Sequence, residues 1–400
     1  MTSALPHGTE TLPDPFTPGV HQDPYPAYRK LRESGAVHPS AIGLPTYYRY
    51  ADVAAILRGR HWGVAFNERR QEGARRLGIA QTFLHQNPPK HTRLRKLVSK
   101  AFTPSAIAAM RPHVMEVCDR LLDSAMADTQ TDLISAYAYP LPITVISELL
   151  GVPTTDYELI HAWSRTLSRG IDPDFSMTPE IIEQRKVAIV DFNRYFAALA
   201  KQRRACPGDD MVTRLTQVQE DGGLSELDLL ATCVLILVAG HETTVNLIGN
   251  SVLALLRNPT QLAMVREGRP EISDTWIDEL LRYDSPVQVL RRTTQEDLEY
   301  GGRTYKRGDT VAVVIGSANR DAAVFTDPEV LDLARQNVSH VSFGLGIHFC
   351  LGAALARLEG ELAISTLLRR APGLRLAEDD PPFRDNVVMR GLERLPVRLR

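Results

Sequence analysis

The sequence predicts a mainly helical fold with small β-sheets set to one side. The chain has 400 residues, of which 44% are hydrophobic and 24% are charged. That is an ordinary globular composition, and the length is ample to bury a large core. Apolar residues recur at helical spacing through most of the stretch 88–258, whereas β-branched and aromatic runs are confined to 37–50 and 287–315.

The N-terminal part is expected to open with an extended arm, 1–22, on a single domain that spans 1–400. A helix is predicted over Tyr25–Ser34 and a hairpin over Val37–Tyr50, where Gly43 and Pro45 supply the turn. Asp52 is expected to cap a short helix through Leu57. The stretch that follows, to residue 86, is irregular and a candidate binding loop.

The middle of the chain is predicted to be almost entirely helical. The expected helices are Lys90–Ala101, Ser105–Ala127, Leu141–Leu150, Thr154–Ser168, Pro179–Arg204 and Ser225–Arg257. Ser225 suits the N-cap of the last one, and Asn258-Pro259 ends it. At 1.5 Å per residue this helix is about 45–50 Å long, so with its apolar middle it should cross the core.

The C-terminal part mixes both kinds of element. A helix over 272–284 is followed by strands at Val287–Leu290, Leu298–Tyr305 and Thr310–Ile315, then by a helix that begins after Cys350 and runs to Arg370, and by a short β tail.

Composition excludes several classes of protein. A formal net charge of −2 gives no support for nucleic-acid binding. The four cysteines are far apart, which argues against a disulfide framework or structural zinc and favours a reducing cytoplasm. The longest apolar stretch, Leu229–Gly240, falls short of the roughly 20 residues of a membrane span, so no membrane anchor is expected.

The most informative stretch is Phe343–Gly352, which reads F-G-x-G-x-H-x-C-x-G. It places Cys350 between a glycine-rich turn and a helix-forming run. Free N–H groups and the helix dipole there favour a thiolate. A lone cysteine is more often a small buried hydrophobe, but the fixed spacing around this one argues for a metal ligand or a nucleophile.

This stretch resembles the haem-binding loop of the cytochrome P-450 family, the haem-thiolate monooxygenases, in its soluble bacterial and actinobacterial form. The resemblance implies that family's fold, a triangular prism with a long central helix over one haem b. It makes Cys350 the axial iron ligand, whose thiolate favours O–O cleavage, and His348 a contact of a haem propionate. Phe343, Gly344 and Gly352 fall at the family's other haem-loop positions.

The middle of the long helix carries a second unusual run, Ala239–Thr244. Gly240 costs about 1 kcal/mol in a helix interior, threonine hydroxyls there can bond back to carbonyls one turn earlier, and a buried Glu242 is costly unless partnered. A solvent-facing kink is the plainer interpretation, but the apolar residues 235–238 disfavour it. The run resembles the family's oxygen-activating helix, which implies that Gly240 lies beside the haem and that Glu242 and Thr243 form an acid–alcohol pair delivering protons.

Glu279 and Arg282 are spaced i, i+3 on one helix face. Alone they would be an exposed ion pair worth a few tenths of a kcal/mol. They fall at the family's E-x-x-R motif, which implies a buried structural network with a further arginine, here Arg335.

A cationic face near residue 90 suits an anionic cofactor. His91 and Arg95, at i and i+4, share that face and could meet two carboxylates. The resemblance implies that they contact the haem propionates and that Arg292 is a third contact. Arg291 is the alternative, because a one-residue slip flips a strand's faces.

The resemblance implies insertion of one oxygen atom of O₂ into a hydrophobic small molecule, by hydroxylation or epoxidation, in secondary metabolism or catabolism. Electrons from NAD(P)H should arrive through a separate ferredoxin and ferredoxin reductase. We expect a cytoplasmic monomer. Cationic residues that could dock an acidic ferredoxin, or simply form a solvated helix face, are Arg93, Lys96, Lys100 and Arg111.

Three other functions compete. A peroxide-driven peroxygenase is disfavoured because Glu242-Thr243 stands where the family's acyl peroxygenases carry Arg-Pro. A non-catalytic haem-thiolate binding or sensor protein has no need of proton delivery. An unrelated helical protein with a chance loop would bind no haem.

The substrate pocket is expected, by analogy of position, to be largely apolar and to include the loops 61–86 and 167–180. Its other predicted residues are Leu235, Val238, Ala239, Gln288, Val289 and Met389.

Overall fold

The structure, a computed structural model, describes residues 20–64, 82–169 and 177–400. As predicted, it is mainly helical. Its longer helices are α1 (Tyr25–Ser34), α2 (Tyr50–Arg58), α4 (Lys90–Ser99), α5 (Pro104–Ala109), α6 (Arg111–Ala125), α7 (Pro140–Leu150), α8 (Tyr157–Arg169), α9 (Pro179–Ala205), α10 (Met211–Glu220), α11 (Glu226–Arg257), α12 (Pro259–Glu267), α13 (Trp276–Tyr283), α14 (Ile315–Ala318) and α15 (Ala353–Arg370).

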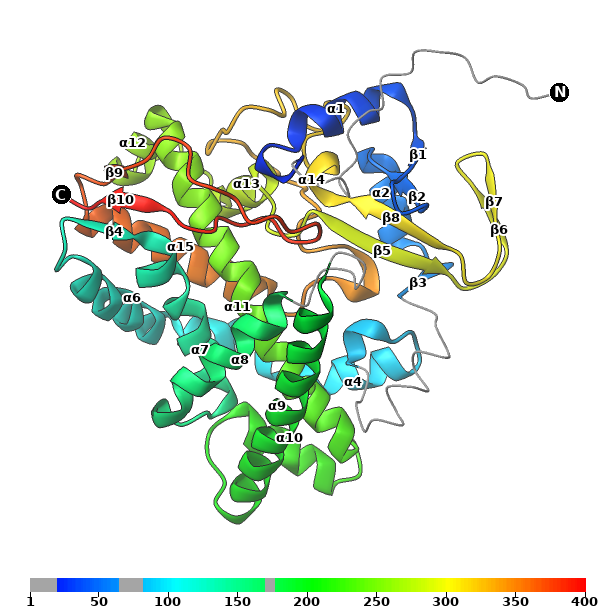
Figure 1. Ribbon diagram of the computed structural model, residues 1–400, viewed down its shortest axis with the longest axis vertical. Coiled ribbons are helices and arrows are strands. Elements are labelled where there is room, and N and C mark those ends of the chain that lie inside the picture. Colours follow the sequence, from blue (N-terminus) through cyan, green and yellow to red (C-terminus); the bar gives the residue numbers. More distant parts are fainter. Residues whose placement is uncertain (1–19, 65–81, 170–176) are drawn as a thin grey trace.

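The strands form small sheets beside the helices (Figure 1). The largest has the order β1-β2-β8-β5-β3 and is antiparallel except where β2 pairs with β8. A second sheet, β4-β10-β9, carries the C-terminal segment, and β6 and β7 form a hairpin. The bounds are β1 (Val37–Pro39), β2 (Pro45–Tyr47), β3 (Trp62–Gly63), β4 (Gln130–Asp132), β5 (Val289–Thr294), β6 (Leu298–Tyr300), β7 (Arg303–Tyr305), β8 (Thr310–Val314), β9 (Arg375–Leu376) and β10 (Pro396–Arg398).

Helix α11 is the long central helix that the sequence predicts. It runs through the helical part of the molecule (Figure 1) and packs against α7 and α15. Ser225 caps it, since its Oγ accepts from the Asp228 N–H at 3.1 Å. This helix is long and apolar enough to cross a membrane, but 67% of its apolar window is buried inside the protein, as in a core helix.

Several details differ from the sequence-based expectation. The helix predicted over 105–127 is two helices, α5 and α6, joined at Met110. Pro112 explains this because a proline near a helix start lacks the N–H that a continuous helix needs. Asp52 does not cap α2; its carboxylate accepts from the Tyr300 hydroxyl at 3.0 Å instead. Helices α10 and α12 were not predicted.

The predicted arm, 1–22, lies outside the described residues except for a short helical turn at Val20–Gln22. Most of the predicted binding loop, at 65–81, and residues 170–176 also lie outside them.

Glu279 on α13 is the centre of a buried ionic network. Arg282 binds it with two hydrogen bonds, Nε to Oε2 at 2.7 Å and Nη2 to Oε1 at 2.8 Å, and both side chains are 0% exposed. The remaining guanidinium N–H groups reach the carbonyls of Asn319, Pro328 and Val330. Arg335 Nε lies 3.1 Å from Glu279 Oε2. The network therefore ties α13 to the segment that leads into the cysteine loop.

Candidate active site

The cysteine loop is a tight turn before α15. The Cys350 N–H donates to the Phe343 carbonyl at 2.8 Å, which closes the turn. Gly344 and Gly346 have φ of 68° and 71°, a region that side-chain-bearing residues rarely adopt. A Cβ on Gly346 would also lie 2.8 Å from the Leu57 carbonyl of α2. The glycines of the motif thus hold the loop closely against α2.

The Cys350 side chain is exposed, two residues before Gly352, the N-cap of α15. Desolvation nevertheless raises the pKa of the Cys350 thiol, while the Gly352 N–H, Arg95 and Arg357 lower it by smaller amounts. Desolvation thus opposes the thiolate that the turn and the helix N-terminus favour. A coordinated metal cation would supply the missing positive charge, because a coordinating thiol is deprotonated outright.

Four side chains from three separate regions form a cationic cradle beside the loop. His91 and Arg95 lie on α4, Arg292 on β5 and His348 in the loop itself. The rings of His91 and His348 are 4.3 Å apart. Arg95 Nη2 donates to the Phe349 carbonyl at 2.6 Å, which fixes α4 against the loop. The structure thus brings together all four side chains predicted to hold the propionates.

Two of the four side chains in the cradle are buried without a hydrogen-bond partner among the described residues. Both ring nitrogens of His91 and of His348 are buried without a hydrogen-bond partner, and within the described part of the chain none of the four side chains pairs with a carboxylate. Burial lowers the pKa of His348 to about 3, helped by the charges of His91, Arg292, Arg95 and His85. Burial also lowers the pKa of Arg292 to about 10.

Buried ring nitrogens without a partner, as in His91 and His348, are rare in a folded protein unless a ligand satisfies them. A planar group with two carboxylates and a metal for Cys350 fits this arrangement, and a Cβ on Gly352 would meet nothing within 4 Å. The side chain of Arg292 is 5% exposed whereas Arg291 is exposed, so Arg292 is the better partner of the two. His85 is a neighbour that the sequence did not suggest.

One face of α11 is less buried than the rest of the helix. Leu235, Ala239 and Thr243 recur every four residues, and Ala239 is exposed although most of the helix is buried. Thr243 Oγ1 donates to the Ala239 carbonyl at 2.8 Å and Thr244 Oγ1 to the Gly240 carbonyl at 3.0 Å. A Cβ on Gly240 would lie 3.3 Å from Ile146 Cδ1, so this glycine lets α11 approach α7. Its place beside the haem stays a prediction.

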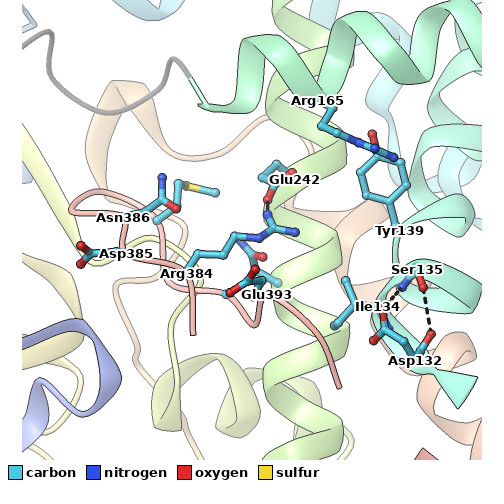
Figure 2. A pocket seen from close by; sticks show the side chains of 13 residues that line it. Asp132, Ile134, Ser135, Tyr139, Arg165, Glu242, Arg384, Asp385, Asn386 and Glu393 are labelled. Atoms are coloured by element: carbon cyan, nitrogen blue, oxygen red, sulfur yellow. Dashed lines mark hydrogen bonds and ion pairs between the residues drawn. The ribbon is translucent and has the colours of Figure 1, made fainter. Parts of the chain in front are cut away.

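Glu242 does not share the face of Thr243. Its carboxylate forms an ion pair with Arg384, which reaches it from the C-terminal segment (Figure 2). The pair borders a cavity of about 490 Å³. Neighbouring helical residues point in different directions, so the acid and the alcohol lie on two sides of one helix.

Two predicted pocket residues, Gln288 and Val289, pack at the large sheet. The side-chain amide of Gln288 donates to the Ser285 carbonyl at 2.7 Å and packs on Gly316. Val289 is buried in a cluster with the α1 residues Tyr25 and Tyr28. Both residues are buried in the packing around the sheet, and their place in the substrate pocket stays a prediction. Leu235 and Val238 are half-buried on α11, and Met389 borders the cavity beside Glu242.

A helical fold in which a cysteine turn lies beside a cationic cradle is the arrangement of a haem-thiolate enzyme. The chain belongs to the cytochrome P450 family, whose model matches residues 45–390. It is therefore a cytochrome P450 monooxygenase, an oxidoreductase that uses haem b.

Curated relatives and solved structures agree with this family assignment. The chain is 42% identical to cytochrome P450 107B1 of Saccharopolyspora erythraea over 410 residues, covering 98% of this chain and 99% of the relative. It is 39% identical to the polyketide biosynthesis cytochrome P450 PksS of Bacillus subtilis, covering 98% of each. The structure of P450BioI with hexadec-9Z-enoic acid-ligated acyl carrier protein matches with a TM-score of 0.89 at 37% identity, covering 95% of this chain and 98% of that one. The predicted fold is thereby confirmed.

Proposed function

We propose that this monooxygenase hydroxylates or epoxidises a hydrophobic small molecule in the cytoplasm, with electrons from NAD(P)H delivered by a ferredoxin and its reductase. The reaction consumes the substrate, O₂, two electrons and two protons and gives the oxygenated product and water. The observation that supports it most is the open Thr243 hydroxyl on the same helix as the ion-paired Glu242. A peroxygenase or a sensor has no use for an acid and an alcohol at Glu242 and Thr243.

The residues divide the work as follows. When bound, haem b supplies the activation of dioxygen at an iron that Cys350 ligates. His91, Arg95, Arg292 and His348 hold the two propionates by charge-assisted hydrogen bonds. Thr243 presents its hydroxyl on the open face of α11, and Glu242 exchanges protons with solvent on the other face.

Thr243→Ala tests the proton role. We expect NAD(P)H consumption to continue while the product formed per NAD(P)H falls several-fold and hydrogen peroxide is released. The reason is that protons are no longer delivered in step with the electrons. Thr244→Ala is the matched control: Thr244 makes the same kind of bond to the helix backbone but is buried. Unchanged coupling in Thr243→Ala would contradict the proposed relay.

The names of the relatives suggest the class of substrate that we propose. One relative is named for polyketide biosynthesis and a structural neighbour holds a fatty acyl chain on acyl carrier protein. A panel of polyketides, free fatty acids and carrier-linked acyl chains should therefore contain compounds that shift the Soret band of the haem protein on binding. If only carrier-linked chains do so, the substrate is presented by a carrier protein.

The ferredoxin is proposed to dock on α4. Arg95 fixes α4 against the cysteine loop, and Lys96 and Lys100 are exposed there. Arg93 and Arg111 are less suitable than the sequence suggests, because Arg93 donates to the Gly223 carbonyl and Arg111 pairs with Glu361. Only the two lysines are thus retained for docking.

Reversing these charges should slow electron transfer. In Lys96→Glu/Lys100→Glu we expect the rate of reduction by ferredoxin to fall about tenfold at low salt and the difference to fade at high salt, because screening removes steering. Lys30→Glu, an exposed lysine on α1, is the control. Equal rates for the double variant and the unmodified protein at low salt would rule out this surface. Light scattering on the same samples tests the proposed monomer.

A further inference from the structure

The C-terminal segment forms a hairpin, 382–393, that borders the cavity beside Glu242. Phe383 and Leu392 pair across the hairpin in an antiparallel bridge. Figure 2 shows its loop at the cavity, and Met389 of this loop, a predicted pocket residue, lines the cavity too. Because a two-stranded hairpin is only marginally stable by itself, contacts with the rest of the protein must fix its position.

Helix α11 supplies the first set of these contacts. Asn250 Nδ2 donates to the Arg390 carbonyl at 3.0 Å. A Cβ on Gly391 would overlap the Asn246 amide, so this glycine lets the hairpin lie directly on the helix. The backbone next to Met389 is therefore held from the side of α11.

The Arg390 side chain reaches two further parts of the chain. It is 7% exposed, and its Nε donates to Asp284 Oδ1, at the end of α13, at 2.8 Å. Its terminal nitrogens donate to the carbonyls of His21 and Gln22, the second at 3.2 Å. Its Cζ lies 3.6 Å from the centroid of the Phe383 ring. Because the guanidinium is charged, these bonds are stronger than neutral hydrogen bonds.

The N-terminal turn also holds the hairpin through the side chain of Gln22. Its Nε2 donates to the Phe383 carbonyl at 2.9 Å, and its Oε1 accepts from the Phe383 N–H at 3.2 Å. The two groups of the amide thus pair with Phe383 as the backbone of a neighbouring strand would. Gln22, Phe383 and Arg390 together form a clasp between the two ends of the described chain.

The clasp acts on Met389 because of the local backbone geometry. Met389 pairs with Val287 in an antiparallel bridge, so the chain is extended there. Successive side chains of an extended chain point to opposite sides. Holding Arg390 on one side therefore fixes the direction of Met389 on the other. Since a methionine side chain is itself flexible, it forms a defined wall only where its backbone is held.

We propose that Gln22 and Arg390 are positioning residues that hold Met389 at the wall of the substrate pocket, so that the N-terminal turn Val20–Gln22 governs how tightly large ligands bind. The inference rests on the proposed function in that it places Met389 in this pocket. Gln22 and Arg390 act through the hairpin and not by touching the ligand. A wall held in place binds a large ligand without the cost of ordering the wall, whereas a ligand too small to reach it gains nothing.

Two azoles test this inference in the haem-loaded protein. Imidazole and econazole both bind a haem iron through a ring nitrogen, which shifts the Soret band, but only econazole carries two aromatic rings that extend into the pocket. In Gln22→Ala and in Arg390→Lys we expect the Kd of econazole to rise about fivefold and that of imidazole to stay unchanged. The lysine keeps a cation for Asp284 but lacks the fork that reaches both carbonyls. Gln336→Ala, which removes an exposed bond between a side chain and the backbone of another loop, is the control.

A double variant separates positioning from a general loss of stability. Met389→Ala should weaken econazole binding, and should weaken it less in the Gln22→Ala background, because the contact is then already impaired. Additive effects would contradict the inference.

The other outcomes also decide. If Met389→Ala changes the Kd of econazole but Gln22→Ala and Arg390→Lys do not, the clasp has no positioning role and Met389 keeps its place in the pocket. If Met389→Ala has no effect, its place in the pocket fails and the inference with it, whereas the monooxygenase reaction is judged separately by product formation. If Arg390→Lys does not fold, Gln22→Ala decides alone, because it removes only two hydrogen bonds of an exposed residue.

Discussion

Replacing Arg282 by methionine is expected to destabilise the protein by about 3–5 kcal/mol, because it leaves the Glu279 carboxylate buried without its main partner. That carboxylate is 0% exposed, and Arg282 supplies two of its hydrogen bonds. The substitution also removes the hydrogen bonds that Arg282 donates to three backbone carbonyls of 319–330. Since a domain is stable by only about 5–15 kcal/mol, we expect poor folding and loss of haem.

Urea unfolding of the haem-loaded protein measures this loss. Arg194→Met is the matched control, because Arg194 pairs with Asp191 at the same i, i+3 spacing but is 76% exposed. That change should cost less than about 0.5 kcal/mol. Equal effects of the two substitutions would show that the Glu279 network does not stabilise the fold.

Glu359→Gln is expected to stabilise the protein at neutral pH and above. Glu359 lies on α15, its Oε2 is buried without a hydrogen-bond partner, and burial raises its pKa to about 8. The folded protein therefore keeps a proton that the unfolded chain releases near the ordinary value of 4.5. Between these two values the folded state binds more protons, so stability falls by about 1.4 kcal/mol per pH unit as pH rises.

The glutamine variant carries no such charge, so its stability should fall less steeply between pH 5 and 8. The variant should exceed the unmodified protein most at pH 8 and least at pH 5, as measured by urea unfolding across that range. Glu361→Gln, two residues along the same helix but exposed, should leave the slope as it is. A slope that Glu359→Gln does not change would mean that Glu359 is already ionised in the folded protein.

The fold, the cysteine loop and the α4 part of the cradle were predictable because their sequence signals are local. The N-cap Ser225, the glycines around Cys350 and the spacing of His91 and Arg95 all act within a few residues. The helix break at Met110 was missed although Pro112 signalled it, because the apolar spacing continued across it. The packing of Val289 against α1 was not predicted because the direction of a strand residue depends on the register with β8.

The surroundings of Glu242 depend on contacts between distant parts of the chain. Glu242 could be suspected of needing a partner, but nothing in the sequence singles out Arg384, 142 residues away. The same holds for the contact of Gly391 with Asn246. The adjacency of Glu242 and Thr243 in sequence also hides their separation on two faces of α11. The structure supplies these relations because only the folded C-terminal segment brings Arg384 to α11.

The account depends most on Cys350 as a thiolate ligand of haem. The visible spectrum of the reduced haem-loaded protein with carbon monoxide tests this directly. We expect a strongly red-shifted Soret band, which requires a thiolate on the iron. Haem bound with a Soret band at the position given by a histidine ligand would contradict the assignment of Cys350, and with it the proposed chemistry.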